Sequence, residues 1–87
     1  MLIRYFAAAR AAAGTDTDTL PLGAPTTRRQ VEAILARTHP HPPPGQPPLA
    51  QVLARSSYLL DGTACPDPAT VLTDTAVLDV LPPFSGG

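Results

Sequence analysis

The sequence closes with Ala76-Val77-Leu78-Asp79-Val80-Leu81-Pro82-Pro83-Phe84-Ser85-Gly86-Gly87. Residues 76–81 are apolar on both faces of an extended chain except at Asp79, a pattern typical of a strand in the middle of a covered sheet. Pro82 and Pro83 lack a backbone N–H and favour extended backbone, so they are expected to end this strand and point the chain away from the body. We therefore predict a folded domain over residues 1–81 and a flexible tail over residues 82–87.

The start of the sequence has the same apolar character. Residues 2–7 read Leu-Ile-Arg-Tyr-Phe-Ala, apolar on both faces apart from Arg4, which predicts a second central strand. Residues 15–22 alternate threonine and aspartate and are expected to pair back on that strand as a moderately exposed partner. If the two apolar strands are neighbours, each keeps its own hairpin partner on its other side, so they must run parallel to each other.

The main helix is predicted at residues 27–38. Thr27 followed by Gln30 matches a capping box, and Pro40 ends the helix. The side chains that then share one helical face are Val31, Ile34, Leu35 and Thr38. This stripe indicates packing against the sheet.

The other segments are expected to be short. Alanine-rich residues 8–13 form a helical turn that Gly14 stops. Residues 39–48 read His-Pro-His-Pro-Pro-Pro-Gly-Gln-Pro-Pro and are predicted to form a surface loop, because proline disfavours both helix interiors and central strands. A second short helix is indicated by Leu49, Val52 and Leu53.

A hairpin is predicted before the last strand. Residues 57–60 form one strand, Asp61-Gly62 is a strong two-residue turn signal, and residues 63–65 return. Residues 72–75 are expected to turn into the last strand. The whole pattern predicts an α+β fold, the ubiquitin-like β-grasp: a mixed sheet with one main helix packed across it and a flexible C-terminal tail.

Composition limits the classes of function. An 87-residue chain forms one domain without room for a large internal substrate cavity, which favours a carrier or binding module. The net charge of −1 provides no basic footprint for nucleic acid. Arginines at positions 4 and 10 interrupt any signal-peptide core, and no run is long enough to span a membrane. A cytoplasmic protein is therefore expected.

Stand-alone catalysis is not indicated. The sequence contains no G-x-G-x-x-G, Walker or HExxH motif. Cys65 is the only cysteine, so it cannot form an internal disulfide, and no metal site is predicted. A Ser/His/Asp arrangement would need His39 or His41, which have no visible orienting partner. Asp16 and Asp18 could be called paired carboxylates, but alternation on an exposed strand explains them better.

The functional group predicted by the sequence is the carboxylate expected on Gly87. A carboxylate is a poor electrophile, but an acyl-adenylate is a reactive acyl donor that sulfur can capture. An activating enzyme must bring a nucleotide phosphate close to the last carbon, and glycine allows that approach because it has no Cβ. We therefore expect Gly87 to react, with Pro82, Pro83, Phe84, Ser85 and Gly86 inserted into a partner's channel.

The sequence resembles the MoaD family, the small sulfur-carrying subunits of molybdopterin synthase, within the MoaD/ThiS group of ubiquitin-like proteins. The resemblance covers the chain apart from the loop at 39–48. It rests on Tyr5-Phe6-Ala7 with Arg10 and Gly14, Thr26-Thr27, Leu60-Asp61-Gly62, Leu72-Thr73-Asp74, and the ending Leu81-Pro82-Pro83-Phe84-Ser85-Gly86-Gly87. Departures from the family pattern occur at Ala11, at Asp74-Thr75-Ala76 and at Phe84.

The resemblance implies a mechanism. An E1-like, zinc-containing adenylyltransferase of the MoeB type uses ATP-Mg to adenylate Gly87, and a persulfide sulfur donor replaces AMP to leave a thiocarboxylate. A MoaE-like large subunit, in an expected heterotetramer, then uses this sulfur to convert cyclic pyranopterin monophosphate to molybdopterin. The catalytic groups lie on the large subunit. Apolar side chains on the exposed sheet face, with Phe84, are expected to contact both protein partners in turn.

Three alternatives belong to other classes. The chain could carry sulfur for thiazole or cysteine biosynthesis. It could be a ubiquitin-like protein modifier whose Gly87 becomes attached to lysines of targets. It could also be a β-grasp interaction module with an inert tail.

Overall fold

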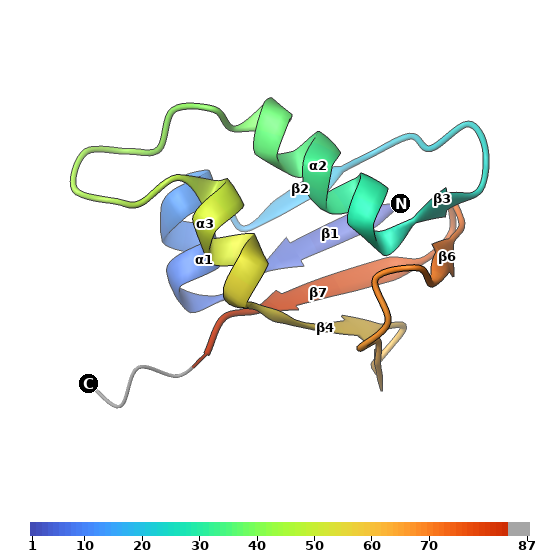
Figure 1. The fold of residues 1–87 in the computed structure, drawn as a ribbon. Coiled ribbons are helices and arrows are strands. Elements are labelled where there is room, and N and C mark those ends of the chain that lie inside the picture. The colour runs from blue at the N-terminus through green and yellow to red at the C-terminus, as the bar shows by residue number, and fades with distance from the viewer. Residues whose placement is uncertain (84–87) are drawn as a thin grey trace.

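The computed structural model describes residues 1–83, and its centre is a five-stranded mixed sheet (Figure 1). The strands in spatial order are β2 (Thr17–Thr19), β1 (Leu2–Tyr5), β7 (Val77–Leu81), β4 (Ser57–Leu60) and β5 (Thr63–Ala64). β1 and β7 are parallel neighbours, whereas β2 pairs antiparallel with β1, and β4 pairs antiparallel with β7. The predicted mixed sheet and its parallel central pair are confirmed.

Three helices build the layer that covers one face of this sheet. α2 (Arg28–Thr38) crosses the strands, and α3 (Leu49–Arg55) packs against both α2 and α1 (Ala7–Ala13) (Figure 1). The side chains of the two central strands that face the helices are fully or almost fully buried: Ile3, Tyr5, Leu78 and Val80. Val31 and Leu35 of α2 complete this core, while Ile34 is only partly buried and Thr38 is exposed.

Local sequence signals set the ends of these elements. The Thr27 side chain accepts a hydrogen bond from the Gln30 backbone N–H, and the Gln30 side chain accepts one from the Thr27 N–H, so the capping box is confirmed. Gly14 ends α1 with φ 75°. Asp61 and Gly62 have φ of 49° and 83°, the positive values that a type I′ hairpin turn requires.

Some predicted strand boundaries were wrong. The second strand covers only Thr17–Thr19 instead of residues 15–22, and the first ends at Tyr5 because Ala7 already begins α1. A second, two-stranded sheet was not predicted: β3 (Thr26–Thr27) pairs antiparallel with β6 (Val71–Leu72). Two-residue strands carry too little periodicity to be detected in a sequence, and their pairing joins residues far apart in the chain.

A partly buried polar cluster corrects two further predictions. The Asp18 carboxylate accepts a hydrogen bond from the Tyr5 hydroxyl at 2.7 Å and lies 2.5 Å from Nε2 of His39. His39 also contacts the Tyr5 ring edge to face, with centroids 6.0 Å apart. Asp18 is therefore not simply an exposed alternating residue, and His39 does have an orienting partner, because the end of α2 lies over the β1–β2 edge. The cluster fixes one end of the proline-rich loop.

The core strand makes a direct stability prediction. Leu78→Ala should lower the free energy of unfolding by about 2–5 kcal/mol, because Leu78 is completely buried and its truncation leaves a cavity. Val71→Ala is the matched control, since Val71 is 56% exposed and should change stability by less than about 0.5 kcal/mol. Urea unfolding followed by circular dichroism measures both; equal losses would contradict the assignment of β7 as the core strand.

Alkaline pH should destabilise the fold through its two tyrosines. Burial, first, and then the adjacent Asp18 raise the pKa of Tyr5, and burial, followed by the Glu32 charge, raises the pKa of Tyr58. The neutral phenols therefore stabilise the fold fully below the unfolded pKa near ~10, and this contribution falls as pH rises above that value. Spectrophotometric titration should show no tyrosinate until the protein unfolds; ionisation near pH ~10 with folded circular dichroism would contradict the burial.

Candidate functional site

The base of the predicted tail lies where the two central strands end. Because β1 and β7 are parallel, their carboxyl ends meet at one edge of the sheet, and Pro82 and Pro83 follow β7 directly (Figure 1). Leu81 is the last residue of the ladder and pairs with Ser57. Pro82 is partly buried and Pro83 is exposed. The predictions for Phe84, Ser85, Gly86 and Gly87 concern residues outside the described part of the chain.

A small groove borders this tail base. Its volume is about 180 Å³, and it lies between α1, α3 and the proline-rich loop. The lining residues are Ala8, Pro47, Gln51, Val52, Arg55, Pro82 and Pro83. Apart from Arg55 and Gln51, which lie on α3, the lining is apolar. The proline-rich loop therefore extends to the tail base, which its composition did not predict.

The second feature of the site is the sheet face that the helices do not cover, here called the open face. Strand alternation places on it the residues between the core positions: Thr17, Thr19, Leu2, Arg4, Val77, Asp79, Leu81, Ser57 and Leu59. Leu2 is 36% exposed, and Val77, Leu81 and Leu59 are partly exposed. Phe6 is 42% exposed, and its extended backbone continues the alternation from Arg4.

An ion pair occupies the centre of this open face. Arg4 donates from Nε to Oδ1 of Asp79 at 2.5 Å and from Nη2 to Oδ2 at 2.8 Å, a bidentate arrangement between neighbouring strands. The hydrogen bonds and the charge of Asp79 raise the pKa of Arg4, so the guanidinium is always charged. Sequence reasoning singled out both residues as exceptions in apolar strands but did not pair them. The prediction that the two strands are parallel neighbours could have revealed this ion pair, because Arg4 lies opposite Asp79 in the register.

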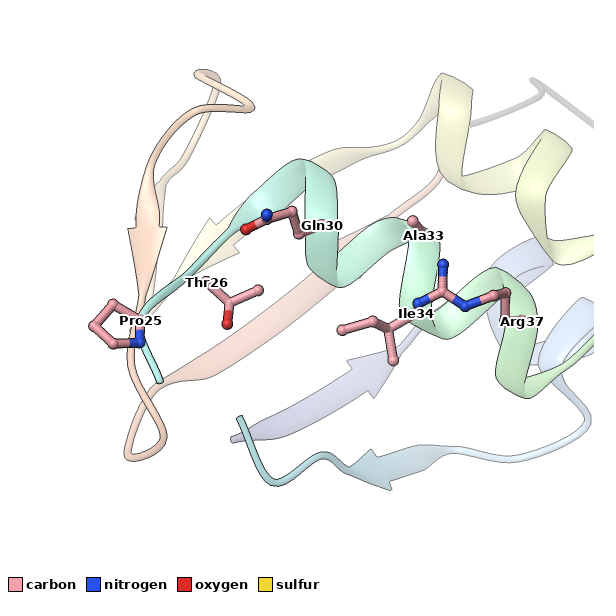
Figure 2. A pocket seen from close by; sticks show the side chains of 6 residues that line it. All are labelled: Pro25, Thr26, Gln30, Ala33, Ile34 and Arg37. Carbon is pink, nitrogen blue, oxygen red and sulfur yellow. The ribbon is translucent and has the colours of Figure 1, made fainter. Parts of the chain in front are cut away.

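A second groove lies elsewhere, along α2. Figure 2 shows Arg37, Ile34 and Gln30 of α2 on one side of it and Pro25 and Thr26 approaching from the segment before the helix. Its volume is about 340 Å³. The groove exposes part of Ile34, which was predicted to lie on the face of the helix that packs against the sheet. Its lining contains no carboxylate, thiol or imidazole that could act as a nucleophile or base.

Among residues 1–83, the remaining reactive side chains do not converge on an active site. Cys65 is buried, and its backbone carbonyl accepts a hydrogen bond from the Arg28 guanidinium. The same guanidinium lies 4.3 Å from the centroid of the Tyr58 ring. Across residues 1–83, no three His, Cys, Asp or Glu side chains are grouped closely enough to hold a metal ion. In the same part of the chain, every helix is too short or too polar to cross a membrane.

Comparisons with known proteins give a consistent result. A family model described as the ThiS family matches residues 3–87. The crystal structure of SAMP1 from Haloferax volcanii is similar with a TM-score of 0.80 and 22% identity, over 100% of this chain and 98% of that one. A complex of subunits 1 and 2 of molybdopterin-converting factor from Helicobacter pylori 26695 contains a chain with a TM-score of 0.64 and 20% identity, over 99% and 96%. No curated protein matches.

Proposed function

The chain belongs to the ThiS family of ubiquitin-like sulfur carriers, and we propose that Gly87 is the residue that it loads with sulfur for the synthesis of molybdopterin. The observation that carries this proposal is the family match, which extends through the Gly86-Gly87 ending. The fold supports it, because Pro82 and Pro83 leave the sheet at the edge where both central strands end. A segment that starts there can enter a partner's active site while the domain stays outside.

In the proposed loading of Gly87 with sulfur, the folded domain supplies no catalytic group. Attack of the Gly87 carboxylate on the α-phosphate of ATP forms an acyl-adenylate and releases pyrophosphate. The terminal sulfur of a persulfide donor then attacks the acyl carbon and displaces AMP, and cleavage of the S–S bond by a second thiol leaves the thiocarboxylate on Gly87. ATP-Mg and both thiols belong to the partners. Glycine at positions 86 and 87 allows the close approach that each attack needs.

The proposed partners dock on the open face. An E1-like activating enzyme and a MoaE-like large subunit must each receive the same tail, so they must bind in turn to the surface around its base. The apolar side chains Leu59, Val77 and Leu81 lie on the open face along β4 and β7, and Leu81 is the one beside the tail base. Apolar residues at the centre of an interface supply most of its affinity. In this proposal the large subunit provides the catalytic groups, and cyclic pyranopterin monophosphate receives the sulfur.

The tail proposal predicts the effect of altering residue 87. Deleting Gly87, or adding an alanine after it, should abolish sulfur loading by the activating enzyme and a persulfide donor, because the acyl carbon is removed or displaced. The folded domain should be unaffected. Intact-mass spectrometry reads loading as replacement of one oxygen by sulfur, with Cys65→Ala as the control that should still load. Loading of the extended chain without trimming would refute the proposal.

The same assay separates the pathways. After loading, the wild-type chain is mixed with the host's large subunit and cyclic pyranopterin monophosphate, and dithiolene formation is measured. Loss of the sulfur to this substrate supports molybdopterin synthesis. Transfer only with a thiazole or cysteine synthase keeps the carrier chemistry and contradicts the pathway, and attachment of Gly87 to lysines of other proteins would indicate a modifier.

The docking proposal predicts a loss of binding from one charge on the open face. Leu59→Glu should weaken binding to both the activating enzyme and the large subunit at least ~10-fold, because an unpaired carboxylate would be buried in an apolar contact. Val71→Glu is the matched control, since Val71 is exposed on the separate two-stranded sheet. Isothermal titration calorimetry measures both, and equal affinities for the two variants would exclude the open face.

A further inference from the structure

The ion pair at the centre of the open face is unequal in its exposure. The Asp79 side chain is only 8% exposed, whereas the Arg4 side chain is 48% exposed. Both oxygens of Asp79 accept from Arg4, one from Nε and one from Nη2. The Asp79 carboxylate therefore has its hydrogen bonds within the domain and is covered. The Arg4 guanidinium is the polar group that the surface of a docked partner would contact.

Only some of the N–H donors of Arg4 have an acceptor within the domain. A guanidinium has five N–H donors in a fixed plane, and Asp79 takes two of them. Within residues 1–83, no further acceptor is hydrogen bonded to Arg4. The other three donors are left for water in the free protein. A partner that covers the open face removes this water, and buried donors need acceptors.

The apolar surroundings make this requirement selective. Leu2 precedes Arg4 by two residues on the same face, Val77 and Leu81 flank Asp79 on β7, and Leu59 pairs with Asp79 from β4. A surface complementary to these side chains is itself apolar. An apolar surface without an acceptor at its centre would leave the Arg4 N–H donors buried without hydrogen-bond partners. This loss weakens binding by roughly 10- to 100-fold.

We propose that Arg4 is a specificity-determining residue of the open face, and that the activating enzyme docks there with an apolar surface that places an uncharged carbonyl oxygen against the Arg4 guanidinium. This inference rests on the proposed function, since it takes the open face as the docking surface. Asp79 already neutralises Arg4, so a second carboxylate would bury a net negative charge. A backbone or amide carbonyl satisfies the donors without adding charge.

The test compares two variants by calorimetry with the host's activating enzyme. Arg4→Leu with Asp79→Ala removes the whole pair and leaves an apolar face, so only the donors for the partner are lost. We expect at least ~10-fold weaker binding, because the partner's carbonyl is left buried without a donor. Arg37→Leu, the same change at an exposed position on α2, is the matched control and should bind as the wild type does.

Arg4→Lys keeps the charge beside Asp79 and guards against misfolding of the double variant. A lysine ammonium cannot reproduce the planar fork that binds two partners at once, so at least ~5-fold weaker binding is expected with unchanged thermal stability. Wild-type affinity in the Lys variant, or in a folded double variant, would overturn the role of Arg4.

Ionic strength tests the uncharged acceptor. If the acceptor is a carbonyl, raising salt from about 50 to 500 mM should weaken binding of the wild type and the double variant by the same factor, because screening acts on net charges. A loss at least ~5-fold greater for the wild type would indicate a partner carboxylate and overturn that assignment. If the wild type does not bind the activating enzyme at all, the docking proposal and this inference both fail.

Discussion

The parallel pairing of β1 with β7 is the constraint on which the rest of the structure depends. It joins the two ends of the sequence, with Leu2 opposite Val77 and Tyr5 opposite Val80. Since both strands run in the same direction, the chain must cross the sheet between them, and the helices of that crossing cover one face. The same pairing brings the end of β7 and the start of α1 to a single edge, where Pro82 and Pro83 follow the sheet.

The two faces of this central pair have different roles. Ile3, Tyr5, Leu78 and Val80 form the buried face and hold the helices. On the other face, the neighbouring positions carry Arg4 and Asp79 among apolar side chains. A carboxylate in a central strand is costly unless it is paired and hydrogen bonded, and the bidentate contact from Arg4 satisfies it. The pairing of β1 with β7 therefore also determines where the half-exposed guanidinium lies.

The proline-rich loop connects features that the sequence keeps apart. At its start, His39 reaches Asp18 and the Tyr5 ring. In the middle, Pro43 lies beside Gly14, where a Cβ would come within 3.3 Å of its Cγ. At its end, Pro47 lines the groove at the tail base. The loop is thus attached to the domain at three points, although its composition predicted only an exposed connection.

The sequence by itself determined the main helix, the central strands and the hairpin turn, because apolar periodicity, the Thr27 capping box and the Asp61-Gly62 turn are local signals. The tail over residues 82–87 stays a prediction. It also indicated the parallel central pair, since strands that are apolar on both faces apart from Arg4 and Asp79 belong in the middle of a sheet. Only the tertiary structure decided the contacts between Arg4 and Asp79, the Tyr5–Asp18–His39 cluster and the β3–β6 sheet. These join residues distant in the chain, and their geometry depends on strand register and on where α2 ends, which no local pattern encodes.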